Sequence, residues 1–204
     1  SHNFEDCEVI HKVLDVSFLK ELLTTSSLTN TDIDNPDVKD MVGEAQPVSY
    51  VPFRNQLFLT IACAYAESIG AETVYHGATQ VDSLAGYWDG STEFQEHFQT
   101  LIGLNRTHQI TLNCPLLSMS KQAIVEFCVG SRVDLKYTYT CYSGDELSDA
   151  TTPSSSLRIK GFADAGYIDP IEYKQDLTKY WEDNKCEPFP INEVFSDRFG
   201  TRGP

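Results

Sequence analysis

The chain has 204 residues, and its hydrophobic fraction of 41% and charged fraction of 22% are ordinary for one soluble globular domain. The formal net charge of −15 repels a phosphate backbone, which argues against duplex DNA or RNA as a partner. No apolar run approaches the ~20 residues of a membrane span, and the N-terminus shows no signal-peptide pattern, so we expect a cytoplasmic protein with no membrane partner.

The N-terminal quarter predicts a strand, a short helix and a loop. Residues 9–16 are rich in β-branched residues and predict a strand, and residues 18–23 predict a short helix. Residues 24–48 are dominated by Ser, Thr, Asn and Asp. This composition is typical of a mobile loop rather than a packed element.

The clearest helix is predicted over residues 52–69, where an apolar side chain recurs at every fourth position. The recurring residues are Leu57, Ile61, Tyr65 and Ile69. Pro52 suits the first helical turn, and Gly70 suits the position just after the helix.

Strands and helices alternate through the rest of the chain. We predict strands at 73–77, 108–113 and 137–141, helices at 93–101, 120–129 and 171–181, and a long loop at 78–92. Ser118 or Ser120 can cap the helix at 120–129. This alternation predicts an α/β fold with a Rossmann-like parallel sheet and helices on both faces.

Ligands of such sheets bind beyond the carboxyl ends of the strands, and three loops there have unusual residues. In the first loop, Arg54 and Asn55 begin the long helix, where a guanidinium and free amides together favour an anion. An exposed arginine on a polar first turn explains the same residues.

The second loop follows the strand at 73–77 and combines acids, aromatic rings and glycines. Carboxylates can accept from ring N–H groups while aromatic faces stack, so this loop suits a flat heterocycle. An ordinary turn-rich loop is the alternative. The candidate residues are Gly77, Asp82, Gly86, Tyr87, Trp88 and Asp89.

In the third loop, Lys121 begins a helix after Ser120. A cation at a helix N-terminus is unfavourable unless an anion lies nearby, which favours a phosphate clamp. A solvated surface lysine is the competing explanation.

Taken together, these segments resemble the 7-cyano-7-deazaguanine synthase family of PP-loop ATP pyrophosphatases. The order and spacing of the resemblance hold over roughly residues 8–170. The matching segments are 51–55 with 64–67, 77–82, 86–89, 93–94, 115–121, 138–144, 157–162, 165–166 and 169–170.

The resemblance implies a reaction in which ATP, with Mg²⁺, adenylates 7-carboxy-7-deazaguanine. Ammonia then displaces AMP, and a second activation dehydrates the amide to the nitrile. Arg54 and Lys121 would be catalytic by offsetting phosphate charge. The substrate-binding set would be Asn55, Gly77, Asp82, Gly86, Tyr87, Trp88 and Asp89.

The family's Ser-Gly-Gly-x-Asp-Ser phosphate loop does not occur in these 204 residues. We therefore expect residues 1–170 to form a PP-loop-type domain without its first strand, and residues 171–204 to form a helical or irregular tail of that domain. We also expect this chain alone not to hydrolyse ATP, because the amides of that loop would hold the pyrophosphate.

Two further departures concern a metal and the substrate loop. Relatives follow the Cys-Tyr dipeptide with three more cysteines, whereas this chain keeps only Cys141 and has Asp149, Thr152 and Ser155 at those positions. One thiolate with hydroxyls cannot form a closed zinc site, so we expect no zinc. Relatives also carry Gly-Tyr-Pro-Asp-Cys-Arg where this chain reads Gly-Tyr-Trp-Asp-Gly-Ser over residues 86–91.

These observations lead to an ATP-dependent ligase that activates a deazaguanine-type carboxylate for ammonia or another amine. The alternative is a non-catalytic deazapurine-binding module, such as a subunit of an anti-phage defence system. Another PP-loop enzyme, such as a tRNA-modifying thiolase, is disfavoured by the charge and by the absence of a CxxC pair among the six cysteines. The aromatic tail leaves a homodimer open.

Overall fold

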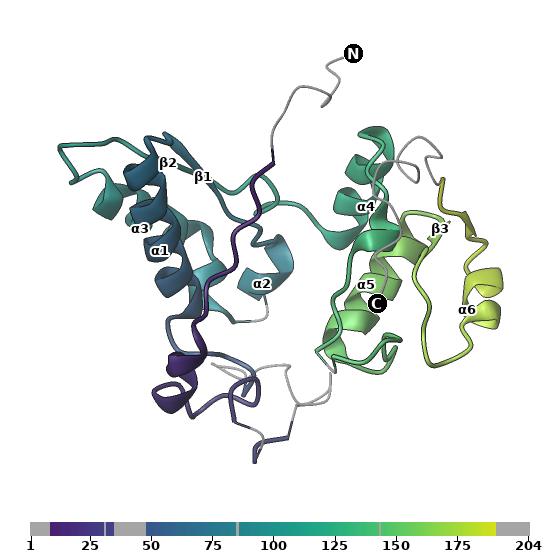
Figure 1. Cartoon of the computed structure of the whole chain (residues 1–204). Coiled ribbons are helices and arrows are strands. Elements are labelled where there is room, and N and C mark those ends of the chain that lie inside the picture. The colour runs from purple at the N-terminus through teal and green to yellow at the C-terminus, as the bar shows by residue number, and fades with distance from the viewer. Residues whose placement is uncertain (1–8, 31, 35–47, 85, 143, 191–204) are drawn as a thin grey trace.

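The computed structural model describes residues 9–30, 32–34, 48–84, 86–142 and 144–190. The helices and strands fall into two groups (Figure 1). The first group contains η2 (Ser17–Glu21), α1 (Arg54–Ile69), β1 (Thr73–Tyr75), α2 (Gln80–Leu84), η4 (Trp88–Gly90), α3 (Thr92–Ile102) and β2 (Thr111–Asn113). The second contains α4 (Lys121–Gly130), η5 (Leu135–Tyr137), α5 (Pro153–Asp164), β3 (Tyr167–Ile168), α6 (Thr178–Asp183) and β4 (Glu187–Pro188).

Helix α1 confirms the clearest sequence prediction, although its buried face differs from the predicted stripe. It ends at Ile69, and Gly70 follows with a φ of 74° and donates its N–H to the last turn. The buried side chains are Leu59, Cys63 and Ala66, whereas Ile69 is exposed. Because α1 is apolar on most sides, a repeat of four alone could not identify the packed face.

Strands β1 and β2 pair in parallel, with Val74 opposite Leu112 and both side chains buried. They share one hydrophobic core with the inner faces of α1 and α3. The Gln99 side chain of α3 donates to Ile110 O (3.0 Å) and accepts from Leu112 N (2.7 Å). It therefore satisfies backbone groups at the edge of β2 that does not face β1. Within the described residues this confirms parallel pairing, but the sheet has only two strands and Tyr75 is exposed on its other face.

Two strand predictions are wrong. Residues 138–141 form no strand, because they follow η5 as one wall of a cavity instead of joining a ladder. Residues 9–16 also pair with no described strand. They run beside α1, where the Lys12 ammonium lies 4.4 Å from the Tyr65 ring centroid, and Val9, Ile10 and Val13 stay largely exposed.

The other elements agree with their sequence patterns to varying degrees. Helices α3 and α4 confirm the predictions for residues 93–101 and 120–129, and Ser120 caps α4 by accepting from Ala123 N at 3.1 Å. The predicted helix at 18–23 is the 3-10 helix η2, and the one at 171–181 shortens to α6. The loop expected at 78–92 contains α2 and η4, and most of the predicted loop at 24–48 lies outside the described residues.

Helix α5 is the main element that the sequence analysis missed. Thr152 caps it by accepting from Ser155 N, and Pro153 occupies its first turn, which together are a start signal. Its inner face, with Ile159 and Phe162, packs with α4, Trp181 and Phe189 in a second core. In the described part of the chain, no helix combines the length and apolar character needed to cross a bilayer.

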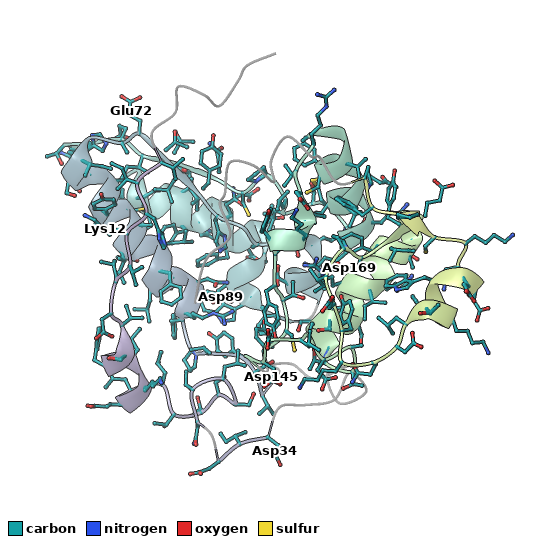
Figure 2. All side chains as sticks on the ribbon, turned by 45° about the vertical axis from the view of Figure 1, so that its right-hand side comes forward. Lys12, Asp34, Glu72, Asp89, Asp145 and Asp169 are labelled. Carbon is teal, nitrogen blue, oxygen red and sulfur yellow. The ribbon has the colours of Figure 1, made fainter. Side chains whose placement is uncertain are left out.

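An ion pair anchors α5 inside this second core. Asp169 and Asp89 lie within the molecule, whereas Glu72 and Asp34 lie at its periphery (Figure 2). Arg158 of α5 donates from Nε and NH2 to the two Asp169 oxygens, at 2.6 and 2.8 Å. It also donates to Thr138 Oγ1 and Leu135 O, so a single guanidinium joins α5, η5 and the segment after β3.

We predict that Asp169→Asn lowers the free energy of unfolding by about 3–5 kcal/mol, because it leaves the Arg158 charge buried without its counter-ion. Urea unfolding measures the change. The control is Asp164→Asn, which removes the exposed Lys160–Asp164 pair and should cost less than about 1 kcal/mol. Equal losses in the two variants would show that the buried pair is not an anchor.

Candidate functional site

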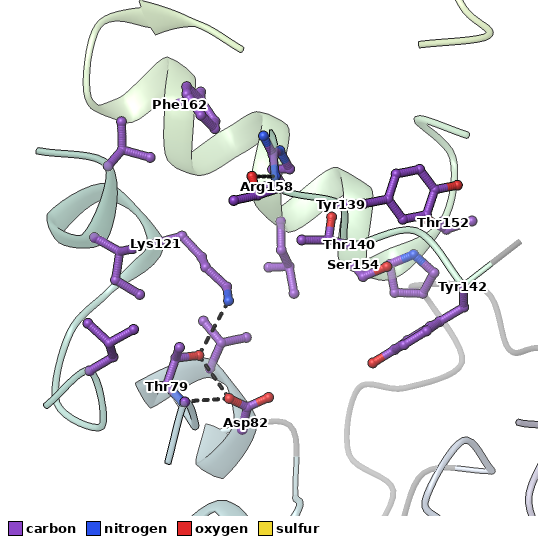
Figure 3. Close-up of a pocket in the computed structure, with 18 of the residues that line it drawn as sticks. Thr79, Asp82, Lys121, Tyr139, Thr140, Tyr142, Thr152, Ser154, Arg158 and Phe162 are labelled. Atoms are coloured by element: carbon purple, nitrogen blue, oxygen red, sulfur yellow. Dashed lines mark hydrogen bonds between the residues drawn. The ribbon is translucent and has the colours of Figure 1, made fainter. Parts of the chain in front are cut away.

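A cavity of about 760 Å³ lies between the two groups of elements (Figure 3). This volume is in the range of small-molecule sites. The first group contributes the residues after β1 together with Tyr87. The second contributes Lys121, the segment 138–142 and the N-terminal half of α5. The cavity therefore depends on the packing of both groups.

Asp82 and Lys121 approach each other across the cavity through Thr79. The Asp82 carboxylate accepts from Thr79 N (2.6 Å) and from Thr79 Oγ1 (2.9 Å). The same hydroxyl oxygen accepts from the Lys121 ammonium at 3.4 Å (Figure 3). A cation, a hydroxyl and an anion thus form one chain of hydrogen bonds, and Lys121 makes no salt bridge within the described residues.

Thr79 was not among the predicted site residues, although the sequence contains a signal for it. Thr79 precedes α2 and Asp82 follows three residues later, which is the spacing of a capping box. Asp82 accepts from Thr79 N, as the acidic member of such a box does. Helix α2 therefore fixes the orientation of the Asp82 carboxylate.

Lys121 is positioned by the contact between α4 and α5. A Cβ atom added to Gly161 of α5 would lie 2.6 Å from Lys121 Cβ and 3.1 Å from the Lys121 carbonyl carbon. Only glycine permits this approach. The Lys121 backbone is held against α5, and its side chain extends into the cavity toward Thr79.

Tyr87 lines the cavity and is held by the segment before α1. Its hydroxyl lies 2.6 Å from the hydroxyl of the buried Ser49, and either group can be the donor. The next residue, Trp88, also binds the segment before α1, because its Nε1 donates to Tyr50 Oη at 2.7 Å. Residues 49 and 50 therefore fasten the loop that carries Tyr87.

Asn55 and Asp89 bind each other. Asn55 N donates to Asp89 Oδ2, and Asn55 Nδ2 donates to Asp89 O, both at 3.2 Å. Asp89 is 2% exposed, and burial raises the pKa of its carboxyl group, while the Asn55 amide and the Arg54 charge oppose that rise. The pair joins the start of α1 to η4 behind the cavity wall.

The structure divides the predicted site residues into two sets. Gly77, Asp82, Tyr87 and Lys121 line the cavity. The predicted residues that do not line it are Arg54, Asn55, Gly86, Trp88 and Asp89. Trp88 packs edge-on against Phe53 and Phe94, and the substrate contact expected of it stays a prediction.

Arg54 and Gly86 lie outside the cavity lining. Desolvation raises the pKa of the Tyr142 phenol and the Arg54 charge opposes that rise, but Tyr142 is 55% exposed, so solvent screens this interaction. Gly86 has a φ of 86°, which allows the turn between α2 and η4. Gly90 lies against Asp82, since a Cβ on Gly90 would be 3.0 Å from Asp82 Cβ.

The far wall of the cavity contains hydroxyl groups with no predicted role. Thr140 Oγ1 and Ser154 Oγ are buried at this wall and have no hydrogen-bond partner among the described residues. The sequence predicted a strand at 137–141 and a family match at 138–144, but no site role for Thr140 or Ser154. Both oxygens are covered by protein atoms in this structure, so a ligand in the cavity does not reach them without a side-chain movement.

A histidine follows β1 and a cysteine follows β2, and burial favours the neutral form of each. Burial lowers the pKa of His76, with Asp82 and Asp89 opposing, and burial raises the pKa of the Cys114 thiol. The Cys114 thiol donates to Ala78 O at 3.4 Å. Neither side chain lines the cavity, whose acidic lining residue is Asp82.

Comparison with known proteins identifies what this chain is similar to. A family model described as "Queuosine biosynthesis protein QueC" matches residues 2–166. A 7-cyano-7-deazaguanine synthase from Oceanobacillus iheyensis is 41% identical over 165 residues, which are 80% of this chain and 73% of the relative. Proteins of the same name from Nautilia profundicola and Campylobacter jejuni subsp. doylei are 38% and 35% identical, over 80% and 79% of this chain and 72% of each relative.

We predict that Gly161→Ala lowers the free energy of unfolding by about 1–3 kcal/mol, because the added methyl overlaps the Lys121 backbone. Gly130→Ala in α4 is the control, since a Cβ there meets nothing within 4 Å and the change should be neutral or stabilise by up to about 1 kcal/mol. Urea unfolding measures both variants. A Gly161→Ala protein as stable as wild type would contradict the tight contact.

Proposed function

Because this chain belongs to the QueC family of 7-cyano-7-deazaguanine synthases, we propose that it is an ATP-dependent ligase acting on a 7-carboxy-7-deazaguanine-type carboxylate. The acceptor is ammonia or another amine, and the pathway is queuosine biosynthesis. We also propose that β1 and β2 belong to the wider parallel sheet of the PP-loop fold. A role in anti-phage defence stays a prediction from sequence.

One observation carries this proposal, namely that Asp82, Tyr87 and Lys121 line a single cavity. A carboxylate accepts hydrogen bonds from the ring and exocyclic N–H groups of a guanine-like base, and a tyrosine offers an aromatic face. Lys121 is the complementary group for a phosphate, since it donates only to a neutral hydroxyl in the described structure. The cavity can thus hold a base near Asp82 and place its carboxylate toward the cation.

The chemistry requires activation because a carboxylate is a poor electrophile. A carboxylate oxygen attacks the α-phosphorus of ATP and pyrophosphate leaves, which forms an acyl adenylate. The amine nitrogen then attacks the acyl carbon, AMP leaves with the electrons of the C–O bond, and the nitrogen loses a proton. Lys121 offsets the charge that accumulates on the phosphate oxygens in these steps.

Mg²⁺ is the metal that this reaction implies. Among the described residues, no group of three or more His, Cys, Asp or Glu side chains could hold a metal ion. This agrees with the usual way in which Mg²⁺ binds in such sites, through substrate phosphates and few protein groups. Within the cavity Asp82 is the carboxylate that could contribute, and the ion would offset charge on the phosphates of ATP.

The reaction is tested by incubating the product of the complete gene with ATP, Mg²⁺, 7-carboxy-7-deazaguanine and ammonium. We expect AMP to form only when the carboxylate is present. The 204-residue chain, measured in parallel, tests the expectation that a chain without the Ser-Gly-Gly-x-Asp-Ser run does not hydrolyse ATP. If no offered amine yields AMP, and calorimetry shows binding of the base without ATP, the protein is the binding module instead.

We predict that Lys121→Met lowers kcat/KM for AMP formation by about 10²–10³-fold, because a charge that opposes the developing phosphate charge is lost. The affinity for the deazaguanine base should change little, since the base contacts lie near Asp82. Lys160→Met, which removes a lysine exposed on α5, is the matched control and should keep full activity. Equal kinetics for the two variants would exclude Lys121 from the reaction.

A further inference from the structure

Four side chains at the cavity, of which three are buried and Thr152 is half-buried, form what we call the hydroxyl cluster: Cys141, Ser148, Thr152 and Ser155. Ser155 is 0% exposed, Ser148 1% and Cys141 5%. The Ser155 hydroxyl lies 2.9 Å from Thr152 Oγ1 and 3.1 Å from Ser148 Oγ. Thr152 Oγ1 also lies 3.7 Å from Cys141 Sγ, so the four side chains are continuous.

The hydroxyl cluster joins three segments of the chain. Thr152 and Ser155 belong to the start of α5, and Cys141 lies between Thr140 and Tyr142, which line the cavity. Ser148 is bound to a third segment, because Lys174 N donates to Ser148 O at 3.0 Å and Ser148 pairs with Tyr173 in a β-bridge. The cluster therefore connects the cavity wall to α5 and to the segment after β3.

The family resemblance implies a zinc ion held by four cysteines at this place, and the residues present do not fit one. Structural zinc sites use four thiolate or imidazole ligands, and the positions equivalent to the lost cysteines are Asp149, Thr152 and Ser155. The Thr152 and Ser155 hydroxyls bind each other. The Asp149 carboxylate accepts from Thr151 and from Gln175 Nε2 (3.0 Å).

We propose that the hydroxyl cluster holds these three segments together in place of a zinc ion, so that the cavity wall of this chain folds without zinc. Buried hydroxyls that satisfy one another tie the three segments together, as a metal would through its ligands. Thr152 Oγ1 lies 2.9 Å from Ser155 Oγ and 3.7 Å from Cys141 Sγ, and Cys141 Sγ lies 4.0 Å from the Asp149 backbone carbonyl oxygen. Zn–S bonds of about 2.3 Å hold the sulfur atoms of a tetrahedral site about 3.8 Å apart, so these positions are near enough to share one ion. The place is therefore also a latent zinc site. The inference concerns the fold and does not depend on the proposed reaction.

Metal content and melting temperature test the first part. The chain purified from zinc-supplemented culture should contain substoichiometric zinc by mass spectrometry, and EDTA should leave its Tm unchanged. One zinc ion per chain, lost together with thermal stability on chelation, would overturn the proposal.

A pair of neighbouring serines tests the hydrogen bonds. Ser155→Ala should lower Tm by about 2–8 °C, because it leaves Ser148 and Thr152 without their shared partner. Ser154→Ala, one residue earlier in α5, removes a hydroxyl that has no partner among the described residues and should not lower Tm. Equal Tm values in the two variants would contradict a stabilising cluster.

A gain of function tests the latent site. The triple variant Asp149→Cys, Thr152→Cys and Ser155→Cys, together with Cys141, should bind one zinc ion per chain and gain a Tm that falls with EDTA. Circular dichroism shows whether the variant is folded. A folded triple variant that takes up no zinc would refute the equivalence of the two arrangements, and an unfolded one that zinc does not refold would do the same.

Discussion

The buried charge pair of Arg158 and Asp169 is the constraint on which the rest of the structure depends. Two charges removed from water must satisfy nearly all their hydrogen-bonding capacity, or they cost more than they contribute. Arg158 meets this condition through Asp169, Thr138 Oγ1 and Leu135 O, and Tyr173 donates to Asp169 at 2.7 Å. The position of α5 is consequently set by directional bonds as well as by apolar packing.

A short series of contacts connects α5 to the cavity. Gly161 receives the Lys121 backbone, and the Lys121 ammonium reaches Thr79, whose hydroxyl and amide both donate to Asp82. This series connects the second core to the end of β1 in the first. A substitution at Gly161 should therefore alter the position of the Asp82 carboxylate on the opposite wall, although Gly161 and Asp82 are linked only through Lys121 and Thr79.

The sequence predicted elements better than it predicted which way polar side chains face. Ser120 and Gly70 indicated helix ends through local backbone chemistry, which is readable from a few neighbouring residues. Pro52 was expected in the first turn of the long helix, but α1 begins two residues later, at Arg54. Asn55 and Asp89 were expected to bind a ligand, and that contact stays a prediction; in the structure they hydrogen-bond each other and do not line the cavity. A polar loop residue has the same sequence pattern whether it faces a cavity or a neighbouring loop. The run at 137–141 had strand composition, yet the partner that decides between ladder and cavity wall lies elsewhere in the chain.

The residues that depart from the family's cysteine pattern are different from the charged residues proposed to act in the reaction. Thr152 and Ser155, where relatives have cysteines, bind each other beside the cavity, whereas Asp82 and Lys121 keep their charges inside it. Hydrogen bonds and metal ligands can both hold a loop, because either one opposes the entropy of a free segment. A phosphate instead brings a negative charge that a cation or converging backbone amides must meet where water is excluded, and this is the requirement to which Lys121 is suited.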